Sequence, residues 1–288
     1  MRYAFFVGCT TLARLPSYEV STRKVAEALG VELLDMEGAG CCGTTYLKCI
    51  EPRTALALAA RNISIAEDMG VNIVTLCNGC TEVLTDANNT LKEEGELRED
   101  VNSILAEVDR EFRGKVEVKH FVRMFLEDLG IDKIRARVSN PLEGLRVAVH
   151  YGCHLLKPFK IMNFDDPEDP TSLDELVNIT GAVSVDYPGK LDCCSAPLLT
   201  IKRRNELATE IAREKLSTVK KYADIMITVC PFCYLMYEQS QMPPNNPIDI
   251  PIVHYSQLLG LAMGIDYQDL ALNENRIDAS VIKNFQNR

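Results

Sequence analysis

The stretch Asn72–Cys80, NIVTLCNGC, runs from a short apolar segment straight into a Cys-x-x-Cys motif. The stretch Asp224–Cys233, DIMITVCPFC, does the same in the second half of the chain. A short apolar run bounded by turn-forming residues is typical of a buried β-strand. The two stretches therefore predict a strand that ends at a pair of cysteines, and they predict it twice.

The cysteines upstream of these stretches repeat as well. An adjacent cysteine pair precedes each Cys-x-x-Cys by 34 or 35 residues, and a single cysteine precedes each pair by 31 or 39 residues. The first set is Cys9, Cys41, Cys42, Cys77 and Cys80, and the second set is Cys153, Cys193, Cys194, Cys230 and Cys233. Because ten of the eleven cysteines follow one plan, the sequence predicts two similar metal–sulfur centres and a role in moving electrons.

The order of predicted strands and helices repeats with the cysteines. The expected strands are Tyr3–Val7, Val31–Leu34, Asn72–Leu76, Arg146–Val149, Ala182–Val185 and Asp224–Val229. Long helices are expected around Arg53–Met69 and Lys202–Tyr222, and further helices from Thr81 and Tyr234 onward. This alternation predicts an α/β fold of two pseudo-symmetric three-layer domains, each with a mainly parallel sheet and a cysteine-rich edge. The division near Asn140 predicts domains of residues 1–140 and 141–288, with one cysteine set in each.

Composition limits the class of protein. The 288 residues are 47% hydrophobic and 25% charged, with a net charge of −10, which disfavours nucleic-acid binding. The sequence contains no run of about 18 apolar residues, so it predicts no membrane-spanning helix. The apolar run Tyr3–Gly8 is too short for the core of a signal peptide, so we expect a cytoplasmic protein. Thiols stay reduced there, which favours metal ligation over disulfides.

The number of cysteines per set discriminates between metals. A structural zinc site takes four ligands, and an ordinary cubane iron–sulfur cluster is also held by four cysteines. Each set offers five, and the closely spaced cysteine run of ferredoxins is absent. The spacing favours iron–sulfur over zinc, with a zinc-stabilised scaffold as the alternative.

The pattern of a single cysteine, Cys-Cys-Gly and Cys-x-x-Cys resembles the cysteine-rich CCG domain. Two such domains in one chain resemble the B subunit of heterodisulfide reductase, from Cys9 to the segment around His254. One departure is Cys193-Cys194-Ser195, where the small Ser replaces Gly; we expect the turn to survive with a different local hydrogen bond.

The resemblance implies two non-cubane [4Fe-4S] clusters, each held by all five cysteines of one set. It also implies reduction of the mixed disulfide of coenzyme M and coenzyme B to two thiols in methanogenesis, with the substrate between the clusters. The partners implied are the ferredoxin-like C subunit, the flavin-containing A subunit, and a hydrogenase or formate dehydrogenase. Two alternatives remain: the same clusters acting on another disulfide or organic substrate, and an electron-transfer or membrane-anchor subunit with no substrate of its own.

Residues outside the cysteine sets yield a few candidates. His154, next to Cys153, can deliver a proton to a departing thiolate or anchor an anionic substrate group, with a structural histidine as the alternative. We expect Cys49 to be a small buried residue, and His120 and His254 to be structural. The anionic groups of the implied substrate need basic contacts. The candidates are Lys48, Arg53, Lys157, Lys160, Lys202, Arg203 and Arg204.

Overall fold

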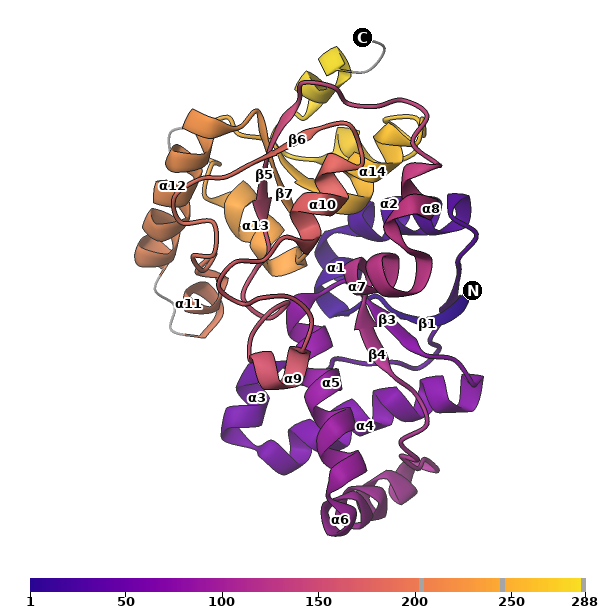
Figure 1. The fold of residues 1–288 in the computed structure, drawn as a ribbon. Helices are drawn as coiled ribbons and strands as arrows, with labels where there is room; N and C mark the ends of the chain where they lie inside the picture. Colours follow the sequence, from indigo (N-terminus) through magenta and orange to yellow (C-terminus); the bar gives the residue numbers. More distant parts are fainter. Residues whose placement is uncertain (202–204, 244–246, 286–288) are drawn as a thin grey trace.

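The computed structural model describes residues 1–201, 205–243 and 247–285, with residues 199–201 described by their backbone alone. Its two four-stranded sheets are built one from each half of the chain (Figure 1). Neighbouring strands run parallel in both sheets, and helices connect them. The predicted α/β fold with two mainly parallel sheets is confirmed.

The first sheet has the strand order β2-β1-β3-β4. Its strands are β1 Arg2–Phe6, β2 Glu32–Asp35, β3 Ile73–Thr75 and β4 Val118–His120. All three residues of the central strand β3 are buried. Helices cover such a strand on both faces, which is why its sequence reads as a continuous apolar run.

The second sheet repeats this order as β6-β5-β7-β8. Its strands are β5 Arg146–His150, β6 Val183–Val185, β7 Ile225–Thr228 and β8 Ile252–His254. The registers also match, since Phe6 pairs with Thr75 in the first sheet and His150 pairs with Thr228 in the second. Phe6 and His150 therefore occupy equivalent positions of the repeat.

The helices of the two halves correspond in part. The first half contains α1 Cys9–Arg14, α2 Pro16–Ala28, α3 Thr44–Ile50, α4 Pro52–Met69, α5 Asn78–Glu93, α6 Gly95–Leu105, η1 Ala106–Val108, α7 Phe121–Met124, η2 Phe125–Leu129 and α8 Ile131–Arg135. The second half contains α9 Phe159–Met162, α10 Ser172–Asn178, α11 Ala196–Ile201, α12 Asn205–Tyr222, α13 Pro231–Gln239, α14 Tyr255–Ala262, η3 Leu272–Glu274 and η4 Ser280–Phe285. Within the residues described, no helix is both long and apolar enough to cross a membrane.

The observed elements differ from the predicted ones mainly at their ends. The six predicted strands are present: β1 and β2 are shifted by one residue, β3, β6 and β7 are shorter by one or two residues, and β5 is one residue longer. The fourth strand of each sheet, which ends at His120 or His254, was not predicted. Both histidines are buried N-caps of the following helix, in keeping with the structural role expected for them.

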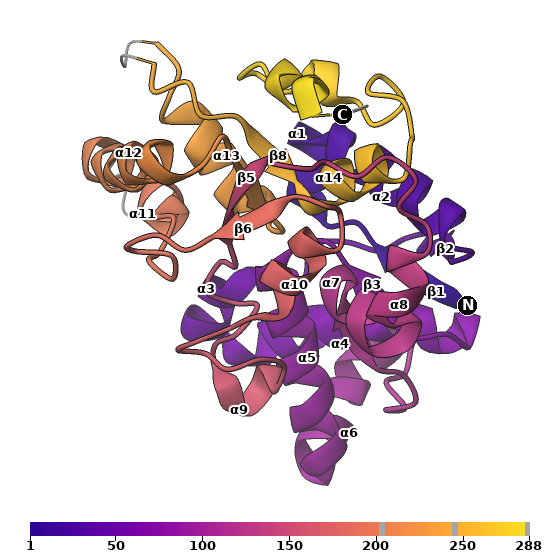
Figure 2. The same ribbon diagram turned by 45° about the horizontal axis from the view of Figure 1, so that its top comes forward.

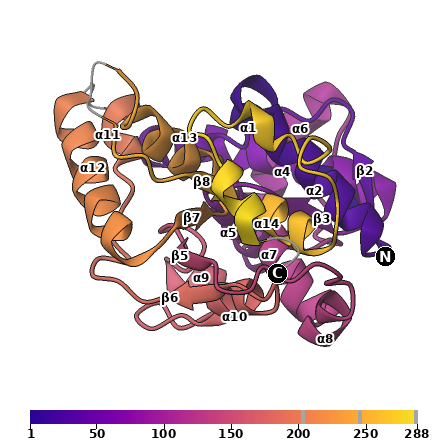
Figure 3. The same cartoon turned by 90° about the horizontal axis from the view of Figure 1, so that it is seen from above.

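The two halves pack tightly through helix α2. This helix belongs to the first half but lies against α14 of the second half in every view (Figures 1, 2 and 3). The Tyr18 hydroxyl donates to the Val229 carbonyl at 3.0 Å, and the Tyr18 ring stacks on His254 with centroids 3.5 Å apart. Ser21 and Ser256 share a buried hydrogen bond of 2.8 Å. These contacts hold the two sheets in one fixed arrangement.

Candidate metal centres

The Cys-x-x-Cys motifs lie at two helix N-termini. Cys77 is the N-cap of α5 and Cys230 is the N-cap of α13, each in an extended conformation. Cys80 and Cys233 follow in the first helical turn, because both helices begin three residues earlier than expected. The positive end of a helix dipole favours thiolates and an anionic cluster.

The adjacent cysteine pairs lie in left-handed turns. The residue after the pair has φ of 97° at Gly43 and 64° at Ser195. Its backbone N–H donates to Cys41 Sγ at 3.5 Å in the first half and to Cys193 Sγ at 3.3 Å in the second. This conformation favours glycine, and Ser195 compensates by donating its hydroxyl to the Ala208 carbonyl at 2.7 Å. The turn survives the Gly-to-Ser departure with a different hydrogen bond, as expected.

A glycine with a left-handed backbone precedes each single cysteine, and in the second half a side chain would also clash there. Gly8 has φ of 80°, and a Cβ on it would lie 3.4 Å from Cys80 Sγ. Gly152 has φ of 72°, and a Cβ on it would lie 2.5 Å from Asn78 Nδ2. The Asn78 side chain crosses from one half to the other and donates to the Tyr151 carbonyl at 2.8 Å. The two cysteine-rich edges are thus joined directly.

Cysteines of both halves face one cleft. Eight of the ten predicted ligands line it: Cys9, Cys42, Cys77, Cys80, Cys153, Cys194, Cys230 and Cys233. Cys41 and Cys193, the first members of the two pairs, are exposed and are not among its lining residues. The Cys77 and Cys230 thiols also interact with each other across the junction between the halves.

The thiols are free, and hydrogen bonds among them decide which of them ionises most readily. Hydrogen bonds from Cys41 and Cys80 lower the pKa of Cys42, and hydrogen bonds led by that from Cys153 lower the pKa of Cys193. The same contacts raise the pKa of the donating thiols. Five neighbouring sulfurs therefore become thiolates together only around a shared cation. Soft thiolate donors in this number fit an iron–sulfur centre.

His154 lies on the wall of the cleft and faces the carboxylate of Glu82, which its sequence pattern does not mark as a site residue. Its Nδ1 is 3.9 Å from Oε2 of Glu82 in α5, and both atoms are buried without a hydrogen-bond partner among the described residues. Glu82 also pairs with Lys48, at 3.4 Å, and Lys48 contacts Asp86. Catalytic hydrogen bonds are often long before substrate binds, so this spacing suits a carboxylate that orients an imidazole.

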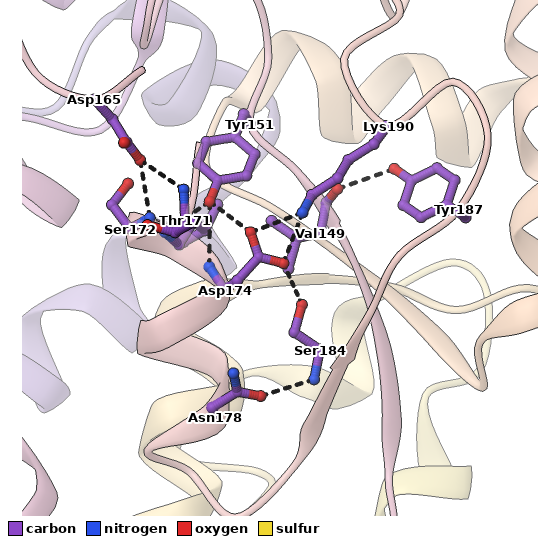
Figure 4. A network of polar contacts seen from close by, with 11 residues as sticks. Val149, Tyr151, Asp165, Thr171, Ser172, Asp174, Asn178, Ser184, Tyr187 and Lys190 are labelled. Atoms are coloured by element: carbon purple, nitrogen blue, oxygen red, sulfur yellow. Dashed lines mark hydrogen bonds and ion pairs between the residues drawn. The ribbon is translucent and has the colours of Figure 1, made fainter. Parts of the chain in front are cut away.

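A network beside the cleft fixes the chain just before Cys153 (Figure 4). The Tyr151 hydroxyl donates to Asp174 at 2.6 Å, and Lys190 Nζ lies 2.8 Å from the same carboxylate. The Tyr187 hydroxyl donates to the Val149 carbonyl at 2.9 Å. The loops that lead to Cys153 and to the second cysteine pair are therefore tied together.

The fold does not bring the basic candidate residues together at the cleft. Arg53 pairs with exposed Asp100, Lys157 pairs with exposed Glu168, and Lys160 is exposed. Lys202, Arg203 and Arg204 lie outside the described residues. Within the described part of the chain, no Lys or Arg lines the cleft.

The expectation for Cys49 was wrong. Cys49 is exposed on α3, and its thiol contacts the Thr45 carbonyl at 3.5 Å. The cause is that α3 is a short surface helix without a single buried residue.

Comparisons with known proteins agree with this geometry. The family described as "CCG: Cysteine-rich domain" matches residues 3–85 and 147–238. The B subunit of a ferredoxin/F420H2-dependent CoB-CoM heterodisulfide reductase of Methanosarcina acetivorans is 39% identical over 96% of this chain and 94% of its own. The B subunit of a ferredoxin:CoB-CoM heterodisulfide reductase of Methanosarcina mazei is 38% identical over the same shares.

Other relatives carry different names. The 8-methylmenaquinol:fumarate reductase membrane anchor subunit of Wolinella succinogenes is 32% identical over 96% of this chain and 98% of its own. A hypothetical protein from Helicobacter pylori has a similar crystal structure, with a TM-score of 0.74 at 16% identity; the match covers 97% of this chain and 52% of that one. Since the family matches both halves and these relatives align over nearly the whole sequence, the protein belongs to the CCG cysteine-rich domain family and carries the domain twice.

Proposed function

We propose that this chain is the catalytic subunit of a heterodisulfide reductase and reduces the mixed disulfide of coenzyme M and coenzyme B to two thiols. The observation that carries the proposal is that both cysteine sets face one cleft. A disulfide presents two sulfur atoms, and a cleft with one centre on each side can engage both. The relatives named as B subunits of heterodisulfide reductases support the same activity.

The proposal assigns one non-cubane [4Fe-4S] cluster to each set of five cysteines. The first cluster belongs to a domain of residues 1–140 and the second to a domain of residues 141–288. When bound, the clusters supply electrons and iron with affinity for sulfur. The overall reaction breaks one S–S bond, consumes two electrons and two protons, and yields one thiol from each half of the substrate.

The protein's own side chains position the substrate and supply a proton. His154 lines the cleft beside Cys153, where a proton on its ring can reach a product sulfur. Glu82 lies behind Nδ1 and favours the orientation that turns Nε2 toward the cleft. Apolar walls that include Phe232 keep bulk water from the reacting sulfurs.

Electrons require companion subunits. The chain contains neither a dinucleotide-binding glycine motif nor a ferredoxin cysteine run. We therefore infer a cytoplasmic complex with a ferredoxin-like C subunit and a flavin-containing A subunit, fed by a hydrogenase or formate dehydrogenase. The relatives named as B subunits of larger reductases support such an assembly.

A second candidate function is electron transfer, or reduction of a different substrate, by the same clusters. The relative from Wolinella succinogenes favours it, because that protein is named as the membrane anchor of a fumarate reductase. The two candidates differ in whether coenzyme M thiol and the mixed disulfide of coenzyme M and coenzyme B bind at the cleft.

The test uses the anaerobically purified complex, studied by EPR with and without coenzyme M thiol. We expect a new paramagnetic signal when the thiol is added, and release of two thiols when the reduced complex receives one equivalent of the mixed disulfide. Iron–sulfur signals that ignore the thiol, together with no thiol release, would replace the proposal with the second candidate.

A further inference from the structure

The two centres differ in what lies behind them. In the second half, His150 at the end of β5 is buried, and one of its ring nitrogens lies with Cys194 Sγ and Cys233 Sγ inside a 4.8 Å triangle. Phe6 occupies the equivalent position at the end of β1 and is also buried. An imidazole thus faces the second cysteine set where the first set has a phenyl ring.

A buried lysine completes the difference. Lys215 is the eleventh residue of α12, and Asn62 is the eleventh residue of the equivalent 18-residue helix α4. Both bond to the backbone that leads into the cysteine pair. Asn62 Nδ2 donates to the Cys41 carbonyl at 3.1 Å, and Lys215 Nζ donates to the Asp192 carbonyl at 2.9 Å. The second half therefore places a positive charge where the first half has a neutral amide.

The contacts of Lys215 fix the tautomer of His150. Lys215 Nζ has three partners: the Lys190 carbonyl at 2.9 Å, the Asp192 carbonyl at 2.9 Å and His150 Nδ1 at 3.1 Å. An ammonium group has three protons and no lone pair, so Nδ1 must accept one of them. A neutral imidazole that accepts at Nδ1 carries its hydrogen on Nε2. Nε2 is buried and has no partner among the described residues.

We propose that Lys215 and His150 form a relay that donates a hydrogen bond from His150 Nε2 to the second centre and gives this centre the higher reduction potential of the two. The inference rests on the proposed function, since it requires a cluster at each cysteine set. Each one-electron reduction adds one negative charge to a centre and makes or breaks no bond. An N–H donor and a buried cation stabilise that charge, whereas Phe6 and Asn62 offer the first centre neither. The second centre is then the first to be reduced.

Neighbouring side chains hold His150 and Lys215 in place. Tyr237 in α13 packs edge-on against His150, with ring centroids 5.0 Å apart, and the equivalent residue in α5 is Leu84. Lys190, whose carbonyl accepts from Lys215, is itself held by Asp174 in the network of Figure 4. His150 and Lys215 therefore have little freedom to turn away from the second centre.

The test is a potentiometric EPR titration of the intact complex. It uses variants in which a residue of the second half is replaced by the equivalent residue of the first half. In His150→Phe and in Lys215→Asn we expect the reduction potential of the second centre to fall by about 59 mV relative to that of the first centre. This corresponds to an about tenfold smaller equilibrium constant for its one-electron reduction. His150→Gln, which retains an N–H donor, should recover part of the shift. Phe6→Leu, a matched change behind the first centre, should move neither potential.

A measurement on the wild-type complex keeps the inference testable if a variant loses its clusters. In a pulsed EPR spectrum of the complex with ¹⁵N-labelled histidine, a hydrogen-bonded Nε2 should give a weak nitrogen hyperfine coupling to the second centre. A strong coupling would mean that His150 is an iron ligand, and no coupling would mean that the relay is not there; either result overturns the inference. Unchanged potentials in His150→Phe overturn it as well. If the wild-type complex contained no iron, that result would instead contradict the proposed function.

Discussion

Ser195 stands in a left-handed backbone position that the first half fills with Gly43. A non-glycine residue there costs about 1 kcal/mol, and the hydroxyl bond to Ala208 recovers about as much. Ser195→Ala keeps the strain and loses the bond, so we expect the free energy of unfolding to fall by about 1 kcal/mol. Ser195→Gly loses both and should stay near wild type. Anaerobic denaturant unfolding checks this order, and an alanine variant as stable as wild type would contradict it.

The pair of His154 and Glu82 supports a second prediction for single residues. If His154 protonates a product sulfur, His154→Gln should lower turnover by about 10²-fold while iron content stays unchanged. Glu82→Gln should lower it less, because the carboxylate only orients the ring. Turnover with the mixed disulfide, normalised to iron, is the measurement. A His154→Gln variant with wild-type turnover would show that the histidine is structural.

Some of the candidate site residues could be predicted from the sequence, and others could be identified only from the fold. The ten cysteines and His154 carry their own signal, through spacing and adjacency. Glu82, Asn78 and Lys215 carry none, because each is an ordinary helix residue until tertiary packing buries it. The lysine could have been noticed only by aligning α12 with α4, where it replaces Asn62.

The chain after β5 approaches α5 closely at Gly152. Gly152 and Gly30 both have φ of 72°, but only at Gly152 would a Cβ meet another residue, Asn78 Nδ2 at 2.5 Å. Gly30→Ala should therefore cost about 1–2 kcal/mol for the left-handed backbone alone. Gly152→Ala should cost more and also lower the iron content, because it displaces Asn78 from the Tyr151 carbonyl. Iron content and unfolding free energy of the two variants, measured side by side, check this; equal losses would contradict it.

Elements with strong local patterns were predictable, and those without were missed. Long amphipathic helices such as α4 and the apolar strands before each Cys-x-x-Cys follow from periodicity. Strands β4 and β8 have only three residues each and end at a helix N-cap, so their pairing in the sheet rather than their sequence defines them. The sheets themselves agree with the prediction because strand–helix alternation leaves few topologies open.

For the molecule as a whole, we expect that metal holds the fold together. The thiols within each set repel one another as thiolates and need a shared cation. Removing iron with a chelator under anaerobic conditions should lower the unfolding temperature by more than about 5 °C, since ligands that bind only the folded state stabilise it. A zinc chelator at matched concentration is the control. An unfolding temperature that does not respond to iron removal would contradict the prediction.

The sequence repeat predicted two similar halves but not how they meet. The contacts of α2 with α14, including Ser21 with Ser256, join residues more than two hundred positions apart and leave no local pattern. They bring the two cysteine-rich edges to one cleft, and the proposed two-centre chemistry depends on this closeness. His150 and Phe6 both lie three residues before the single cysteine of their set, and the fold shows that the two positions are equivalent in the sheets.

Anomalous diffraction at the iron edge, from crystals of the anaerobically purified complex, would locate the metal centres. We expect two groups of iron in this chain, one beside Cys42 and Cys80 and one beside Cys194 and Cys233, on opposite sides of the same cleft. Each group should contain about four irons. A single group, zinc in place of iron, or disulfides between these cysteines would contradict it.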